Sequence, residues 1–334
     1  MYESHFGLDE KPFSLLPDAG FLYLTKKHSL ALTMLQYGLE SQAPISVVTG
    51  NIGCGKTTLL RKLMDEVADD VTIGLITNTH SSFGELLQWV LLAFGLDYRD
   101  KSKVERYEIL VDFIIEEYAK GKHTVLIVDE AQNMDMSTLE ELRMLSNINV
   151  DKHQVLQLVL VGQPELRSML RQPELRQFAQ RISADYHIRP LDQSETVEYV
   201  KHRLTVAGGN EDIFHPDTFP LIQEHTSGVP RLINILCDTA LVYAFGAQQD
   251  NVDAKIIREV VKDRGSAVYF DDADTYGYLQ GKHDKPALRV VHQSKQQSAE
   301  NPDATQIKQA LNEIETLLKT HLDQQPDRGA ETKK

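Results

Sequence analysis

The residues with the clearest chemistry form one short run, "GNIGCGKT", at residues 50–57. The run fits the pattern G-x-x-x-x-G-K-[ST], in which glycines let backbone N–H groups surround phosphate oxygens. We expect a strand before it and a helix after it, because a helix N-terminus adds partial positive charge to such a site. In that setting Lys56 supplies a cation to the outer phosphates and Thr57 supplies a hydroxyl to Mg²⁺.

The predicted cofactors are therefore ATP and Mg²⁺. The residues that we expect to line the nucleotide are Gly50, Asn51, Ile52, Gly53, Cys54, Gly55, Lys56, Thr57 and Thr58. Cys54 fits this loop as a small residue, and a redox switch at its thiol is a weaker alternative.

Two carboxylates follow an apolar run further along the chain. "TVLIVDE" at residues 124–130 reads as a buried strand that ends in Asp129 and Glu130. Asp129 is placed to hold Mg²⁺ through water, and Glu130 to orient or deprotonate the attacking water. Two solvated acids after a strand are the alternative interpretation, but the glycine-rich loop upstream favours catalysis.

A polar side chain also follows the next apolar run, "LVLVGQPEL". Gln163 stands where that strand would end, beside the strand that carries the two acids. From there its amide would reach the terminal phosphate or the attacking water. Asn133 is a weaker rival for the same role, and an ordinary polar residue between a strand and a turn is the alternative.

The elements that must position these side chains alternate between strands and helices. Nearly continuous apolar runs at 44–50, 71–77, 124–130 and 155–162 predict strands that are buried on both faces. A fifth strand is expected at 186–191. Helical spacing of apolar residues between these runs predicts an α/β domain with a parallel sheet over residues 44–191. Residues 1–43 form a lead-in segment with a first helix.

The pattern changes after residue 191. Segments 193–207, 216–227, 230–247 and 253–263 all have helical spacing, with Asp192 or Ser194 as the cap of the first. We therefore predict a small all-helical lid domain at 192–264. The polar residues 265–303 predict a flexible linker, and residues 304–334 a short amphipathic helix with a tail.

Composition restricts the classes of function. The formal charge of −14 argues against non-specific attraction of the whole molecule to nucleic acid. Two cysteines cannot build a disulfide framework, which fits a reducing compartment. We see no signal peptide at the start, and the longest apolar run, "LLQWVLLAFGL", is too short to span a bilayer. These features predict a cytoplasmic protein.

The order of these motifs resembles the ExeA-like (general secretion pathway A) AAA+ ATPases. The resemblance begins in "HFGLDEKPFSLLPDAGFLYLTKKHSLALTMLQYGL" and continues through "GNIGCGKTTLLRKL", "VLIVDEAQNM", "LVLVGQPEL", "QRISADYHIRPL" and "SGVPRLINILCD". It covers residues 1–264. ATPases of MSHA-type pilus biogenesis, of exosortase systems and of transposition look similar over the same span. The resemblance therefore indicates an AAA+ ATPase with a lid more firmly than it indicates a pathway.

The resemblance also assigns roles to arginines. In such proteins ATP sits at a boundary between subunits, and an arginine of the neighbour reaches its terminal phosphate. Arg181 occupies that position here, and Arg176 is the runner-up. Arg167 and Arg171 are expected to face water. Arg231, in "GVPR", is implied to contact the nucleotide from the lid.

We therefore expect Mg²⁺-dependent ATP hydrolysis by a homo-oligomer, coupled to assembly of an envelope secretion, pilus or exopolysaccharide system. A DNA-associated ATPase of the transposition-target type is the alternative. Members of the resembled family continue into a transmembrane helix and a peptidoglycan-binding module, and nothing after residue 264 is expected to supply either. Attachment to the inner membrane would then run through a partner.

Overall fold

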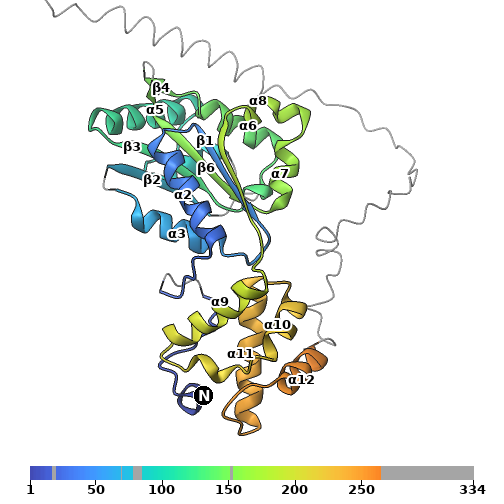
Figure 1. Ribbon diagram of the computed structural model, residues 1–334. Coiled ribbons are helices and arrows are strands. Elements are labelled where there is room, and N and C mark those ends of the chain that lie inside the picture. The colour runs from blue at the N-terminus through green and yellow to red at the C-terminus, as the bar shows by residue number, and fades with distance from the viewer. Residues whose placement is uncertain (17–19, 69, 78–84, 151–152, 265–334) are drawn as a thin grey trace, which may run out of the picture. The chain divides into compact units, whose positions relative to one another are not determined.

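The computed structural model describes residues 1–16, 20–68, 70–77, 85–150 and 153–264 of the chain (Figure 1). The predicted linker at 265–303 and helix at 304–334 lie outside these residues. Five parallel strands form one sheet in the order β2-β3-β6-β1-β7. Their bounds are β1 Ile45–Gly50, β2 Val71–Ile76, β3 His123–Val128, β6 Leu156–Gly162 and β7 Ile182–Ile188.

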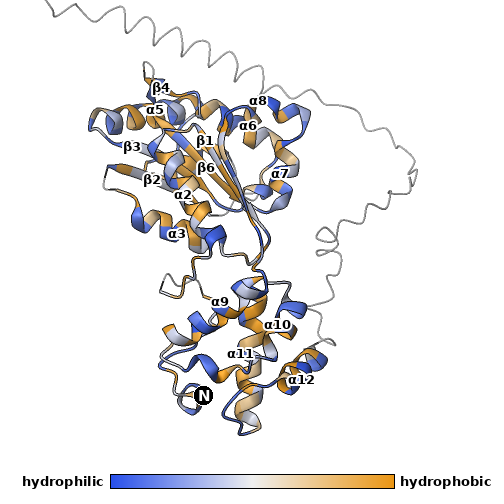
Figure 2. Cartoon of the chain, in the orientation of Figure 1, coloured by the Kyte–Doolittle hydropathy of each residue, from blue (hydrophilic) through white to orange (hydrophobic). Residues whose placement is uncertain are grey.

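The four continuous apolar runs are confirmed as strands of this sheet, but β2 lies at its edge and is mostly half-buried, not covered on both faces as predicted. Every residue of β1 and of β6 is buried, because helices cover both faces of the sheet. Figure 2 shows these two central strands in the hydrophobic colour. The third strand ends at Val128, so Asp129 and Glu130 lie just beyond its carboxyl end.

The fifth strand was predicted too late in the chain. It runs from Ile182 to Ile188, not over 186–191, and it pairs with β1 alone. This strand alternates exposed polar residues with buried ones such as Ala184 and Ile188, the pattern of a strand that is buried on one face. A search for continuous apolar runs therefore misses its first half. A small antiparallel pair, β4 Asn149–Val150 with β5 His153–Gln154, was not predicted.

Helices cover the two faces of the sheet. On one face α2 (Lys26–Glu40) and α3 (Lys56–Glu66) pack on alternate strand residues, among them Val48, Ile127 and Val161. The other face packs against α4 (Leu86–Ala93), α5 (Lys103–Ala119), α6 (Met136–Leu145), α7 (Pro164–Leu170) and α8 (Arg176–Ala179). The period of two along each strand sends neighbouring side chains to opposite layers.

The four helical segments after the sheet are confirmed. They are α9 (Gln193–Val206), α10 (Thr218–Thr226), α11 (Pro230–Gly246) and α12 (Ala254–Arg264). Asp192 caps α9 by accepting a hydrogen bond from the Glu195 N–H, and the Glu195 carboxylate accepts one from the Asp192 N–H. This reciprocal pair of bonds satisfies two backbone donors at the start of the helix. We call these four helices the lid.

The first residues of the chain add to the core of the lid. Phe6, the last residue of the short helix α1 (Glu3–Phe6), and its N-cap Tyr2 are buried among lid residues, as are Leu8, Phe13 and Phe21. The buried Arg203 of α9 donates to the carbonyls of Pro12 (2.5 Å) and Ser14 (3.2 Å). Across the residues that the structure describes, no helix is both long and apolar enough to cross a bilayer.

Candidate functional site

The loop from β1 to α3 has the local structure that its glycines predict. Gly53 and Gly55 have φ values of 79° and 86°, in the left-handed region that suits glycine. Gly55 is the N-cap of α3, so the helix begins at Lys56. The first N–H groups of a helix have no partner within it, and here they face a loop built to bind an anion.

Lys56 is buried at the base of this loop, with 6% of its surface exposed. Its Nζ donates to the carbonyl oxygens of Gly50 (2.8 Å) and Asn51 (3.1 Å). Burial lowers the pKa of the Lys56 ammonium, and the nearby Glu130 carboxylate partly opposes that shift. A cation held by two carbonyls beside the loop can exchange them for phosphate oxygens.

Thr57, in the first turn of α3, and Asp129, just after β3, come together. The Thr57 hydroxyl donates to Asp129 Oδ2 at 3.0 Å, and the Glu130 N–H donates to Asp129 Oδ1 at 2.9 Å. Burial raises the pKa of Asp129, and these two hydrogen bonds oppose it. Hydroxyl and carboxylate oxygens are suitable Mg²⁺ ligands, and Mg²⁺ takes its remaining ligands from phosphates and water. The pair therefore fits the predicted metal position, although the described residues hold no cluster of three or more His, Cys, Asp or Glu side chains able to bind a metal.

Glu130 is held by two glutamine side chains. Its Oε2 accepts a hydrogen bond from Gln132 Nε2 at 2.6 Å and another from Gln163 Nε2 at 3.2 Å. Gln132 Oε1 in turn accepts from the Gln163 N–H at 2.9 Å. The structure thus brings Gln163 to Glu130 at the ends of neighbouring strands, whereas its contact with the terminal phosphate or the attacking water stays a prediction. The bridging residue Gln132 was missed.

The backbone around this network is specialised. Glu130 has φ 53°, which is uncommon for a residue other than glycine and often marks a functional site. Gly162, at the end of β6, lets Gln132 approach closely, because a Cβ there would lie 2.9 Å from Gln132 Oε1. Asn133, the weaker rival of Gln163, is exposed, and its Oδ1 lies 3.5 Å from Gln132 Nε2.

The lid reaches the loop through the start of α11. The Arg231 N–H donates to the Gly53 carbonyl at 3.2 Å, and a Cβ on Gly53 would lie 2.5 Å from the Arg231 Cβ. The exposed Arg231 side chain lines a pocket together with the loop. Further lining residues come from the first segment and the lid, including Leu16, Tyr23, Tyr199 and Asn234. Arg231 therefore lies where the resemblance implies, at the lid side of the loop.

Cys54 is fully enclosed in the loop. Its side chain is 1% exposed, and burial raises the pKa of its thiol to about 11. Since the thiolate is the reactive form, burial and the raised pKa both disfavour reaction at this thiol. The loop therefore uses Cys54 as a small packing residue. Cys237 is also free and buried.

The predicted trans arginine, Arg181, stands at the opposite end of the strands from the loop. It precedes Ile182, which pairs with Ile45 at the start of β1. A six-residue strand spans about 20 Å, so Arg181 cannot reach the loop of its own chain. Its Nη1 donates to the Ser146 carbonyl and hydroxyl, both at 2.9 Å, at the C-cap of α6.

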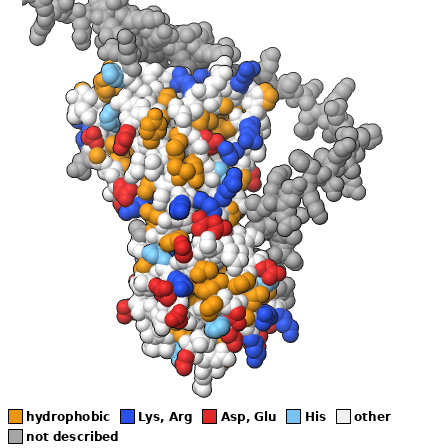
Figure 3. Space-filling model, viewed as in Figure 1, with side chains coloured by type: hydrophobic (Ala, Val, Ile, Leu, Met, Phe, Trp, Pro, Cys, Tyr) orange, Lys and Arg blue, Asp and Glu red, His pale blue; other side chains and the backbone are white. Residues whose placement is uncertain are grey.

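The other arginines of this region are half-buried or exposed. Arg167 Nη2 donates to Asp185 Oδ2 at 2.7 Å, so it does not simply face water. Arg171 and Arg176 are exposed. Figure 3 shows Lys and Arg side chains gathered over the side of the sheet that carries α7 and α8. Exposure favours Arg176 as the arginine that is available to another chain.

Comparisons with known proteins agree with this fold. Residues 39–170 match the family model of the AAA domain. The chain is 42% identical over 246 residues to General secretion pathway protein A of Aeromonas hydrophila, an alignment that covers 73% of this chain and 45% of that protein. The chain thus spans less than half the length of this relative.

Solved structures show the same fold at low sequence identity. The ORC2 protein of Aeropyrum pernix, in its ADPNP and ADP complexes, aligns with a TM-score of 0.56 and 17% identity, over 76% of this chain and 72% of its own. Cdc6p of Pyrobaculum aerophilum gives 0.55 and 17%, over 74% and 71%. The chain therefore carries an AAA domain over residues 39–170, and over the 73% of its length that aligns it is similar to General secretion pathway protein A.

Proposed function

We propose that this protein hydrolyses ATP in a Mg²⁺-dependent reaction at the loop between β1 and α3. The observation that supports the proposal is the meeting of Thr57, Asp129, Glu130 and Gln163 at the carboxyl ends of β1, β3 and β6. Ligands bind at that edge in open parallel sheets.

Each side chain has a role in this proposal. Lys56 leaves the carbonyls of Gly50 and Asn51 to neutralise the outer phosphates. Thr57 and Asp129 would hold Mg²⁺, which neutralises charge on the phosphates when it is bound. Glu130 takes a proton from the attacking water or orients it, and Gln163 fixes the direction of the Glu130 carboxylate. Arg231 contacts the nucleotide from the lid.

The proposed site is shared between copies of the chain. Arg181, or Arg176 as its rival, would stabilise the terminal phosphate of a neighbouring copy, because Arg181 lies at the opposite end of the strands from the loop of its own chain. If Arg181 has this role, its hydrogen bonds to Ser146 would position the guanidinium for the neighbouring copy. If Arg176 has it, those bonds would only stabilise the end of α6.

We further infer that hydrolysis drives assembly of an envelope partner complex at the cytoplasmic face of the inner membrane. Support comes from the relative in Aeromonas hydrophila, which carries secretion in its name. Secretion, pilus and exopolysaccharide systems are all partners of this kind. A DNA-associated role has no comparable support, because structures below 25% identity share only the fold. Binding of duplex DNA that weakens steeply with salt would favour that role instead.

Phosphate release from ATP tests the proposal. The wild-type protein is expected to release phosphate with Mg²⁺ and to stop when EDTA removes it. Lys56→Ala should bind no nucleotide, whereas Lys62→Ala, on the same helix and paired with Glu66, should behave as wild type. Hydrolysis that survives in Lys56→Ala would show that the site lies elsewhere.

A further inference from the structure

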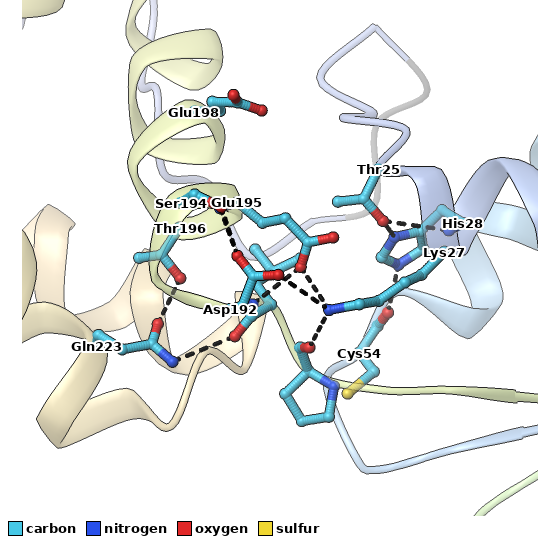
Figure 4. A network of polar contacts seen from close by, with 12 residues as sticks. Thr25, Lys27, His28, Cys54, Asp192, Ser194, Glu195, Thr196, Glu198 and Gln223 are labelled. Atoms are coloured by element: carbon cyan, nitrogen blue, oxygen red, sulfur yellow. Dashed lines mark hydrogen bonds and ion pairs between the residues drawn. The ribbon is translucent and has the colours of Figure 1, made fainter.

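The first turn of α2 lies between the phosphate loop and the lid, and none of the roles above involves it. Figure 4 shows Lys27 and His28 reaching in two directions, toward the start of α9 and toward Cys54. We propose that His28 is a positioning residue that fixes the backbone of the phosphate loop, and that Lys27 ties the same turn to the lid. This inference rests on the proposed function, since it concerns how the loop holds ATP.

The His28 ring is buried and bonded at both nitrogens. Only 4% of its surface is exposed. Nε2 lies 3.0 Å from the Cys54 carbonyl oxygen, and Nδ1 lies 2.8 Å from Thr25 Oγ1. The Thr25 oxygen also accepts from the His28 N–H at 3.2 Å.

These partners specify one form of the ring. A carbonyl only accepts, so Nε2 carries the proton and donates to Cys54. Nδ1 then accepts from the Thr25 hydroxyl, and every bond is satisfied with a neutral imidazole. Burial lowers the pKa of His28, which agrees with a neutral ring. His28 therefore acts as a fixed hydrogen-bond donor.

The bond to Cys54 orients the next peptide of the loop. In a trans peptide the C=O and the following N–H point in opposite directions. With the Cys54 carbonyl held toward His28, the Gly55 N–H points away from it. Gly55 has φ 86°, in the left-handed region that suits glycine, and its Cα side faces His28, since a Cβ there would be in ordinary contact with Nε2 at 3.5 Å. Residues Cys54, Gly55 and His28 all line the same pocket.

Lys27 extends this link to the lid. Its Nζ lies 2.6 Å from Glu195 Oε2 and 3.6 Å from Asp192 Oδ2, and it donates to the Pro190 carbonyl at 3.2 Å. Asp192 and Glu195 are the two residues that cap α9. The two adjacent side chains of α2 therefore hold the loop on one side of the pocket and the entry to the lid on the other.

Two substitutions at position 28 separate the hydrogen bond from the packing. The amide nitrogen of His28→Gln extends as far as Nε2 and keeps the donor to Cys54, whereas the shorter His28→Asn loses it. The affinity for a fluorescent ATP analogue is measured in EDTA, so that hydrolysis does not contribute. His28→Asn should bind about tenfold more weakly, the cost of one lost hydrogen bond. His28→Gln should bind close to wild type.

Equal affinities of the Asn, Gln and wild-type chains would overturn the proposal, as would equal weakening of both variants. If the wild-type chain binds no analogue, the proposed function itself fails, which is a different result. Should His28→Asn not fold, Thr25→Val tests the same bond by removing the hydroxyl at Nδ1. It should bind more weakly than Thr25→Ser, and equal affinity would contradict the proposal.

The link to the lid has its own test. Lys27→Met removes the cation while keeping the length of the side chain, and Lys27→Arg keeps the charge. If the turn couples the two sides, the effects of Lys27→Met and His28→Asn on analogue affinity are not additive in the double variant. Additive effects, or no effect of Lys27→Met, would remove Lys27 from the proposal.

Discussion

The Glu130 carboxylate is the group whose surroundings bear most directly on chemistry. Its Oε2 accepts from Gln132 and Gln163, which arrive from different segments. A carboxylate fixed by two amides has a defined direction, as a general base requires. Gln132 also accepts a hydrogen bond from the Gln163 N–H, so it fixes Gln163 relative to Glu130.

Replacing Gln132 by leucine tests this network at the scale of one residue. Leucine has a similar size but cannot donate to Glu130 or accept from the Gln163 N–H. Turnover should fall about tenfold or more, because a hydrogen bond to a charged group contributes roughly 1.5–3 kcal/mol. Nucleotide affinity should stay unchanged, because Gln132 does not line the phosphate loop. The matched control is the exposed neighbour in Asn133→Ala, which should keep wild-type turnover. Steady-state kinetics measures turnover in both variants. Equal turnover in Gln132→Leu and Asn133→Ala would show that the hydrogen bonds of Gln132 do not contribute to catalysis.

Part of the site could be predicted from the sequence because it lies in local patterns. Lys56 and Thr57 belong to one eight-residue motif, and Asp129 and Glu130 to the end of one apolar run. Gln132 and His28 could not be found in this way. Their partners, Gln163 and Cys54, lie 31 and 26 residues away, so only the folded chain shows the contacts.

Among the elements, the first segment of the chain belongs to the core of the lid. Phe13 is 1% exposed, and its ring stacks edge-on against Phe214 with centroids 5.8 Å apart. Arg203 lies over the Phe21 ring at 4.4 Å and binds the carbonyls of Pro12 and Ser14. Ser14 lines the pocket, so this packing also positions the pocket wall.

Phe13→Ala should therefore destabilise the protein although it lies far from the lid in sequence. Loss of a fully buried phenylalanine costs about 3–5 kcal/mol of unfolding free energy. Leu16→Ala, at a leucine that is 79% exposed, should change stability little. Denaturant unfolding of the two variants measures the difference. A small effect of Phe13→Ala would mean that the first segment is not part of the folded core.

The strands and helices that could be predicted from the sequence are those whose burial leaves a clear pattern of apolar residues. Strands covered on both faces give continuous apolar runs and long amphipathic helices give a helical period, and the structure confirms these elements. The edge strand β7 alternates, and α6, α7 and α8 are short, so their patterns are weak. The packing of the first segment on the lid joins residues some 200 positions apart, which no local pattern encodes.

At the scale of the whole molecule, the proposed arginine acts on another copy of the chain. Arg181→Ala should keep nucleotide affinity but lose turnover, by roughly 10³-fold if it acts as arginine fingers do. Lys56→Ala lacks a working loop but keeps its arginine. A mixture of the two inactive variants should regain part of the activity, and wild-type activity per chain should rise with protein concentration.

The same mixture distinguishes the two arginines. Recovery with Arg176→Ala in place of Arg181→Ala would assign the role to Arg176, leaving Arg181 to hold Ser146 at the end of α6. If neither mixture recovers and activity is independent of concentration, each chain has a complete site. In that case neither arginine takes part in hydrolysis, and both are ordinary residues of the surface or of the folded structure.

The most direct test of the account is the behaviour of Glu130→Gln. The amide keeps the size of the side chain and one oxygen that can accept from Gln132 and Gln163, but it cannot accept the proton of the attacking water. We predict that this variant binds ATP with wild-type affinity and releases almost no phosphate, so that the ATP-bound state accumulates. Both quantities are measured on one preparation, by equilibrium binding and by phosphate release with Mg²⁺. Hydrolysis by Glu130→Gln at the wild-type rate would contradict the account, because the chemistry would then not depend on the carboxylate around which this site is built.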